Sequence, residues 1–138
     1  MTMQSIATGK ELAAIQFTLD GALVQDYLAA TEDSSSLYTK SGLVPFTAVA
    51  ALGVRTVLGG LSLPPGTIHL AQELTAHKSA SLGQRVSCSA KVAQSSQRRE
   101  GTFLVLEFVV ADAQGQALLD GKTTLMVPSL KAEGQEQR

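Results

Sequence analysis

The sequence predicts an α+β domain in which one curled antiparallel sheet wraps around a single apolar helix. The first observation is the segment 42–61, GLVPFTAVAALGVRTVLGGL, which is apolar on nearly every side and has Arg55 as its only charge. A helix without a polar face has to be surrounded by protein. The second observation is that strand-like segments follow this helix one after another, which favours an antiparallel sheet over alternating β-α-β units.

Length and composition indicate one domain that folds without metals or disulfides. The 138 residues are 44% hydrophobic, which is enough for a sizeable core. We expect the domain to span residues 1–130 and the polar end KAEGQEQR, residues 131–138, to be disordered. Cys88 is the single cysteine and has no zinc-type spacing around it, so the sequence indicates no metal and no cofactor.

The charge pattern argues against nucleic acid and membranes as partners. The net charge is −1, the eleven basic residues form no continuous stripe, and tryptophan is absent, so phosphate neutralisation and base stacking both lack a platform. No apolar run approaches the ~18 to 20 residues that a membrane-spanning helix needs. We therefore expect a soluble, cytoplasmic protein without a signal peptide.

The segments before the apolar helix read as a strand, a short helix and a loop. Residues 15–19 alternate in polarity, as a half-buried strand does, and Asp20-Gly21 follows as a turn. Residues 22–31 place apolar side chains at helical spacing. The cluster Glu32-Asp33-Ser34-Ser35-Ser36 should end this helix in a loop, because such side chains compete for backbone hydrogen bonds.

The apolar helix has recognisable ends. Pro45 suits a first turn, where its missing N–H would have no partner, and Gly59-Gly60 suits a stop. The helix contains no Asp or Glu. The glycine and alanines along it allow a sheet to approach its backbone closely.

Four segments after the helix carry the period of strands: 68–79, 86–93, 102–111 and 117–127, with a hairpin turn at 112–116. In the first of them, simple alternation puts Ile68, Leu70 and Leu74 on the face toward the helix. It puts His69 and Glu73 on the opposite face, at an outer or interface position, and His77 continues that face. A sheet of this size leaves one side of the helix bare, which favours burial against a second copy.

At this point the residues resemble a known family. The segment 17–50, FTLDGALVQDYLAATEDSSSLYTKSGLVPFTAVA, is similar to the start of MaoC-like hydratases and dehydratases, including the related domain of fungal-type fatty-acid synthases. Asp33-Ser-Ser-Ser-Leu-Tyr38 has the spacing of that family's loop, D-x-N-P-x-H or D-x-N-P-x-Y, and Gly42-Leu-Val-Pro45 matches the start of its central helix. The segment 63–92 also looks like its following strands. The resemblance implies the hot-dog fold.

The resemblance also implies thioester chemistry. In the family, the loop aspartate and histidine position a water molecule and move a proton between 3-hydroxyacyl and enoyl thioesters. Carried over, Asp33 is the carboxylate, and Gly42, Leu43, Val44 and Pro45 form the substrate site, where N–H groups polarise the thioester carbonyl. Tyr38 falls in the histidine's place, and a tyrosine keeps its proton to about pH 10, whereas a histidine titrates near pH 6.5.

Three functions follow from the resemblance. The chain is an acyl-CoA or acyl-carrier-protein hydratase or dehydratase, or it is a non-catalytic, acyl-binding subunit of a heteromeric dehydratase. The third, an acyl-CoA thioesterase, is weakened by the lack of an acidic residue in the helix. A homo- or heterodimer with another hot-dog subunit is expected. For Asp33 the alternative is a purely structural role in ending the preceding helix, and for Tyr38 it is packing.

Overall fold

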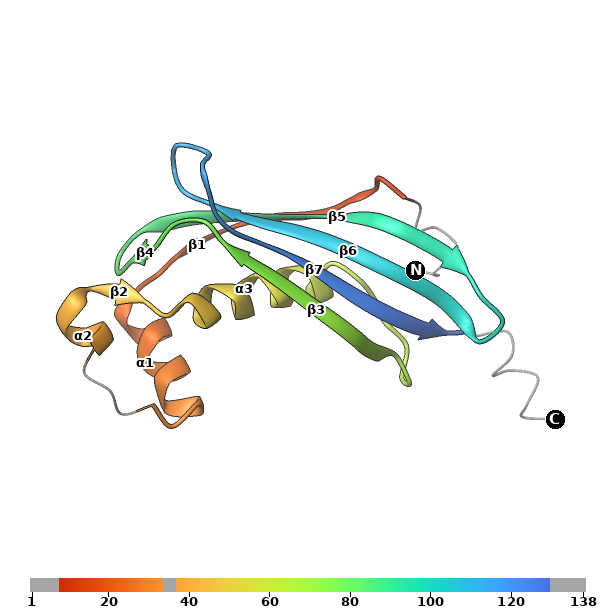
Figure 1. Ribbon diagram of the computed structural model, residues 1–138, viewed down its shortest axis with the longest axis horizontal. Helices are drawn as coiled ribbons and strands as arrows, with labels where there is room; N and C mark the ends of the chain where they lie inside the picture. Colours follow the sequence, from red (N-terminus) through yellow and green to blue (C-terminus); the bar gives the residue numbers. More distant parts are fainter. Residues whose placement is uncertain (1–7, 34–36, 130–138) are drawn as a thin grey trace.

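The computed structural model describes residues 8–33 and 37–129 and shows an antiparallel sheet curling over one long helix (Figure 1). The strand order is β1-β5-β6-β7-β3. These strands are β1 (Glu11–Thr18), β3 (Ile68–Ala76), β5 (Arg85–Gln97), β6 (Gly101–Ala111) and β7 (Ala117–Pro128). The predicted hot-dog fold is confirmed. The predicted tail, residues 131–138, lies outside the described residues.

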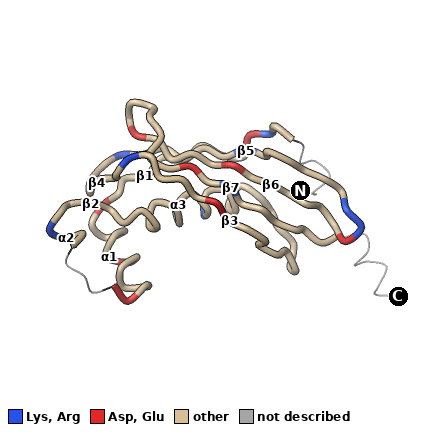
Figure 2. Tube along the Cα trace, in the orientation of Figure 1, with Lys and Arg blue, Asp and Glu red and all other residues tan. Residues whose placement is uncertain are grey.

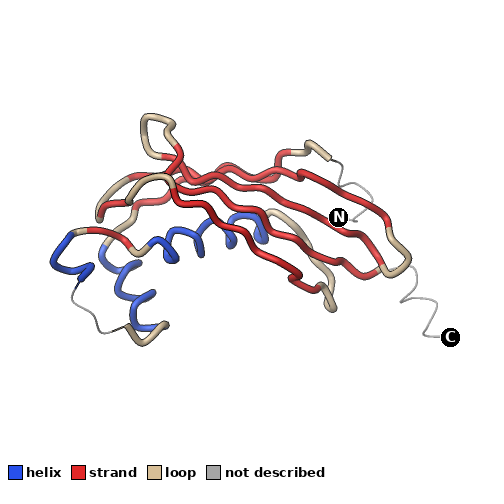
Figure 3. The backbone as a smooth tube through the Cα atoms, in the orientation of Figure 1, coloured by secondary structure: helices blue, strands red, loops and turns tan. Residues whose placement is uncertain are grey.

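The helices lie on the concave side of the sheet and beyond one of its ends (Figure 3). The central helix is α3 (Phe46–Gly59), and two further helices precede it, α1 (Gly21–Ala30) and α2 (Leu37–Ser41). A two-stranded pair, β2 (Leu43–Val44) with β4 (Ala80–Ser81), closes the same end. No helix in the described part of the chain is long and apolar enough to cross a membrane.

The core lies between α3 and the inner face of the sheet. Phe108 of β6 is its largest fully buried side chain, and the ring fits between two glycines. A Cβ atom on Gly53 of α3 would lie 2.1 Å from the ring, and one on Gly121 of β7 would lie 2.4 Å from it. Both distances are far below van der Waals contact, so glycine at these two positions is what lets helix, ring and sheet approach so closely.

The ends of α1 follow local rules. Asp20 caps its start, accepting a hydrogen bond from the N–H of Leu23 at 2.9 Å. At its end Glu32 takes a left-handed conformation (φ 56°) and donates its N–H to Ala29, and the N–H of Asp33 donates to Leu28. This is the pair of hydrogen bonds of a Schellman motif.

The edge strand β3 contains an irregularity that alternation does not reveal. His69 pairs with Leu125 of β7, and Ala71 pairs with the preceding residue along the partner, Thr124, so Leu70 is an extra residue. The bulge reverses which face of the sheet each β3 residue before Leu70 occupies. His69 therefore lies on the inner face with Gln72 and not on the outer face with Glu73, and the prediction for His69 was wrong.

The outer face carries a row of alternating charges across all five strands (Figure 2). The paired positions along this row are, in strand order, Glu11, Lys91, Glu107, Lys122 and Glu73. Directly opposed side chains of opposite charge stabilise strand pairing, and a register shift would bring like charges together. The row therefore supports the register that the buried inner face requires.

Candidate functional site

A cavity of about 430 Å³ lies where the start of α3 meets the end of β3 and the start of β7. Its lining is largely apolar and includes Tyr38, Leu43, Val44, Phe46, Ala76 and Leu119. His77 and Lys78 are the basic residues of this lining. The structure thus brings Tyr38 together with Leu43 and Val44, three of the residues that the sequence analysis singled out.

The wall formed by β2 is held by Gly42. This residue has φ 71°, a left-handed conformation that glycine adopts without strain. Its N–H donates to the carbonyl of Tyr38 at 3.0 Å, and its carbonyl accepts from the N–H of Leu82 at 2.8 Å. Gly42 therefore joins α2 to the β2–β4 pair and fixes Tyr38 beside the cavity.

The geometry changes which N–H groups are open to a ligand. The N–H of Gly42 is bonded to Tyr38, and that of Leu43 donates to the Ser41 hydroxyl at 3.2 Å, so neither is an open donor as predicted. Pro45, which has no N–H, is the N-cap of α3. The first-turn N–H groups of Phe46 and Thr47 have no partner inside the helix. These two donors stand where the helix dipole is positive.

Tyr38 and Tyr27 support the site through contacts with the core and with α3. Tyr38 is partly buried on α2 and packs against the core while lining the cavity. Tyr27 of α1 donates its hydroxyl hydrogen to the Thr47 hydroxyl, which ties α1 to the first turn of α3. The sequence analysis missed this contact, because no periodicity links residues that are 20 positions apart.

Asp33 lies apart from this cavity lining. It is exposed, immediately after the end of α1, and its N–H takes part in ending that helix. The structural alternative predicted for Asp33 is thus observed for its backbone. Residues 34–36, which complete the loop motif between Asp33 and Tyr38, lie outside the described residues.

Two basic side chains near the cavity are engaged by acids. The Lys78 ammonium donates to Asp112 at 3.1 Å and to Gln116 at 2.8 Å. The N–H of Gln116, together with Lys78 and the N–H of Gln114, lowers the pKa of Asp112 below its ordinary value, against the opposing effect of burial. His77, which also lines the cavity, pairs with Asp120 of β7 at 2.7 Å.

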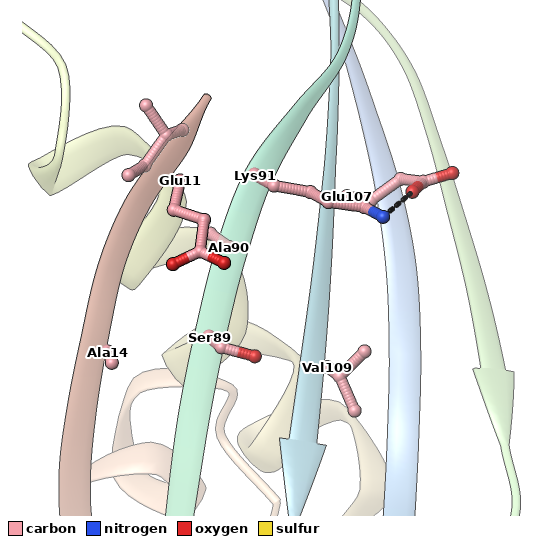
Figure 4. A pocket seen from close by; sticks show the side chains of 8 residues that line it. Glu11, Ala14, Ser89, Ala90, Lys91, Glu107 and Val109 are labelled. Atoms are coloured by element: carbon pink, nitrogen blue, oxygen red, sulfur yellow. Dashed lines mark ion pairs between the residues drawn. The ribbon is translucent and has the colours of Figure 1, made fainter. Parts of the chain in front are cut away.

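A second hollow lies on the outer face, over β1, β5 and β6 (Figure 4). Its labelled side chains include Glu11, Ser89 and Val109, and Lys91 reaches toward Glu107 at 3.9 Å. These are members of the charge row and their neighbours. Among the described residues that line this hollow there is no helix terminus, tyrosine or histidine, so the cavity at α3 is the better candidate for chemistry.

Comparisons with known proteins agree with this geometry. No protein-family model matches the sequence, and no curated protein matches it. Among solved structures, the (R)-hydratase from A. caviae involved in PHA biosynthesis superposes with a TM-score of 0.74 at 22% identity, covering 91% of this chain and 99% of that one. The MaoC-like dehydratase from Rhodospirillum rubrum gives 0.72 at 12% identity, with 94% and 98% covered.

A third similar structure is the C-terminally truncated HadBC (3R)-hydroxyacyl-ACP dehydratase complex from Mycobacterium tuberculosis, at a TM-score of 0.67 and 14% identity, with 87% and 98% covered. The chain has the hot-dog fold of these hydratases and dehydratases. The resemblance to MaoC-like proteins that the sequence suggested is confirmed at the level of the fold. At these identities the likeness carries the fold, and the chemistry has to be argued from the residues.

Proposed function

We propose that this chain is a hydratase- or dehydratase-type subunit that binds the acyl thioester of CoA or of an acyl carrier protein. The observation that carries the proposal is the apolar cavity at the N-terminus of α3, in a fold shared with (R)-hydratases and dehydratases. An acyl chain needs an apolar lining. A thioester carbonyl needs hydrogen-bond donors where negative charge develops.

The roles follow from position. The thioester carbonyl accepts hydrogen bonds from the N–H groups of Phe46 and Thr47, and the acyl chain lies along Leu43, Val44 and Leu119. Tyr38 donates a hydrogen bond to the substrate, because a tyrosine hydroxyl is a good donor and a poor base at neutral pH. We assign Asp33 the role of the acid/base carboxylate only because its loop resembles the family motif.

A second hot-dog subunit is part of the proposal. β3 is an edge strand of the described sheet, and Ile68 and Leu70 on it are 56% and 49% exposed. Exposed strand edges with apolar side chains invite pairing with another chain. Tyr38 in place of a histidine favours a second candidate, a non-catalytic subunit that shapes the acyl site of a heteromeric dehydratase, and HadBC is a complex of two named chains.

The test is hydration of crotonyl-CoA by the purified chain, followed as loss of the enoyl-thioester absorbance. Turnover that falls at least about 100-fold in Asp33→Asn supports an enzyme with Asp33 in its site. Asp26→Asn is the matched control, because Asp26 is exposed on α1. Turnover that appears only after a complete Asp/His hot-dog subunit is added supports the second candidate. Release of free CoA without hydration would replace both with a thioesterase.

A further inference from the structure

A hydrogen-bonded network on the inner face of β3 orients His69. The ring Nε2 of His69 lies 3.0 Å from the side-chain oxygen of Gln72, and the hydroxyl of Thr123 donates to the same oxygen at 2.9 Å. Thr123 is fully buried. A buried hydroxyl with a fixed partner holds the amide in one place, so the histidine is presented by a rigid support.

The network also fixes the histidine tautomer. The amide nitrogen of Gln72 donates to the carbonyls of Lys122 at 3.1 Å and of Glu73 at 3.3 Å, so its oxygen must be the atom that faces His69. An amide oxygen only accepts, and Nε2 therefore donates. In the neutral ring Nδ1 is then unprotonated, and its lone pair can accept a proton.

Within one chain this histidine is far from the cavity. His69 is near the start of β3 and Ala76, which lines the cavity, is at its end. At ~3.3 Å per residue the two α-carbons are roughly 20 Å apart. The histidine cannot serve the cavity of its own protomer.

A second copy paired along β3 removes this separation. α3 packs against β1, β5, β6 and β7, and Leu74, on the same inner face as His69, stays 37% exposed. Two β3 strands can pair antiparallel along their full length if the symmetry axis passes through Gln72. In this register Glu73 lies opposite the partner's Ala71, so the two Glu73 carboxylates do not face each other. Because Leu70 is bulged, His69 then lies opposite the partner's Leu74, with its side chain on the same face.

That position is next to the partner's cavity. Diagonal neighbours across an antiparallel pair are about 7–8 Å apart, which is the separation expected between His69 and the partner's Ala76. We propose that His69 of one protomer is the proton-transferring histidine of its partner's cavity, in place of the histidine that the loop lacks at Tyr38. The inference rests on the proposed hydratase function and names the residue that completes the site.

The chemical step balances without any further reactant. Nδ1 of His69 takes one proton from a water molecule while the water oxygen forms the bond to C3 of the enoyl thioester. The C2–C3 π electrons move toward the thioester carbonyl, giving an enolate that is stabilised by the N–H groups at the start of α3. The imidazolium then returns the proton to C2, and the net result is addition of one water.

A cross-linking experiment tests the placement without depending on activity. In the double variant His69→Cys, Leu74→Cys, the two positions are too far apart on one strand for a disulfide, which needs α-carbons within about 7 Å. We expect a disulfide-linked dimer under mild oxidation, and none in either single variant or from buried Cys88. Absence of the linked dimer in the double variant would overturn the placement.

Turnover tests the chemical role. His69→Gln keeps a polar side chain on an exposed strand position and should lower kcat/KM for crotonyl-CoA hydration by about 100-fold or more. Glu73→Gln is the matched control, since Glu73 lies on the same strand but on the outer face, opposite Lys122, and does not line the cavity. Equal rates for His69→Gln and wild type would overturn the role. A wild type without turnover would instead be a failure of the proposed hydration activity, and the cross-link would still decide the placement.

Subunit mixing separates action across the interface from action within one chain. Leu43→Trp fills the cavity of its own protomer and leaves His69 in place. When the two variants are co-expressed, each mixed dimer has one intact site: the cavity belongs to the His69→Gln protomer, and the histidine belongs to the Leu43→Trp protomer. Random pairing should restore roughly a quarter of the wild-type activity from two inactive variants. No recovery in mixed dimers would contradict action across the interface.

Discussion

The two faces of the sheet use different physics to specify the same register. The inner face is held by close packing, with the Phe108 ring between Gly53 and Gly121 and no room for one added methyl group. The outer face is held by opposed charges, such as the pair Lys91–Glu107 at 3.9 Å. Each exposed ion pair contributes little to the free energy of unfolding, whereas a steric misfit in a packed core lowers it substantially. Stability therefore comes mainly from the inner face, and the outer face mainly opposes wrong registers.

The largest effect should come from the inner face. Gly53→Ala forces a Cβ atom into the Phe108 ring, and we expect the free energy of unfolding to fall by about 2 kcal/mol or more in urea titrations. Gly59→Ala is the control, because a Cβ there meets nothing within 4 Å and alanine favours a helix by about 0.5–1 kcal/mol. Phe108→Leu should partly rescue Gly53→Ala. Equal effects of the two glycine substitutions would argue against the close approach.

An intermediate effect is expected at the hairpin that joins β6 to β7. Asp112 accepts hydrogen bonds from the N–H groups of Gln114 and Gln116 and pairs with Lys78. Because the pKa of Asp112 is lowered in the folded protein, its charged form stabilises the fold fully at pH values above the ordinary aspartate pKa, near 4. This contribution is lost as the pH falls through the lower pKa of the folded state. Asp112→Asn should therefore lower Tm at pH 7.

The pH dependence is the distinguishing readout for Asp112→Asn. The difference in Tm from wild type should shrink below about pH 4, where Asp112 of the unfolded chain begins to bind a proton, and should be smallest at the still lower pH at which the folded carboxyl is protonated. Asp26→Asn, with the same change of charge on the exposed side of α1, should leave Tm nearly unchanged. A difference that stayed constant from pH 7 to the acid limb would show that charge is not the cause.

The smallest effect should come from the outer face. Glu107→Lys places three lysines side by side, with Lys91 and Lys122 as neighbours. We expect a loss of up to about 1 kcal/mol in the free energy of unfolding at low salt. Most of it should vanish at about 1 M salt, where the Debye length is only ~3 Å. Glu100→Lys, in the exposed β5–β6 turn, is the control and should show no comparable salt dependence.

Much of the fold was predictable because periodicity reports which face is buried. The strands of the five-stranded sheet, α1 and the apolar α3 were predicted within a few residues, and Pro45 marked the start of α3, but the short strands β2 and β4 were not predicted. The segment 37–41 was not predicted as a helix, since five residues are too few to show a period. β5 runs to Gln97 instead of ending near 93, because pairing with β6 overrides the polar composition of its end.

The candidate site was predictable only in part. Leu43, Val44 and Tyr38, which the resemblance singled out, line one cavity, and the first-turn N–H groups without a partner inside α3 are those of Phe46 and Thr47. The reason is local, since the earlier N–H groups, those of Gly42 and Leu43, already donate to the Tyr38 carbonyl and the Ser41 hydroxyl. His69 was placed on the wrong face because a one-residue bulge inverts alternation and leaves no mark in composition.

The most direct test of the central claim, a thioester site at the start of α3, is an amide NMR titration with crotonyl-CoA, using CoA alone as the reference. The account predicts that the acyl thioester specifically shifts the N–H signals of Phe46 and Thr47, with smaller shifts at Val44 and Ala76. Shifts confined to Glu11, Ser89 and Lys91 around the outer hollow, or identical shifts with CoA alone, would contradict it.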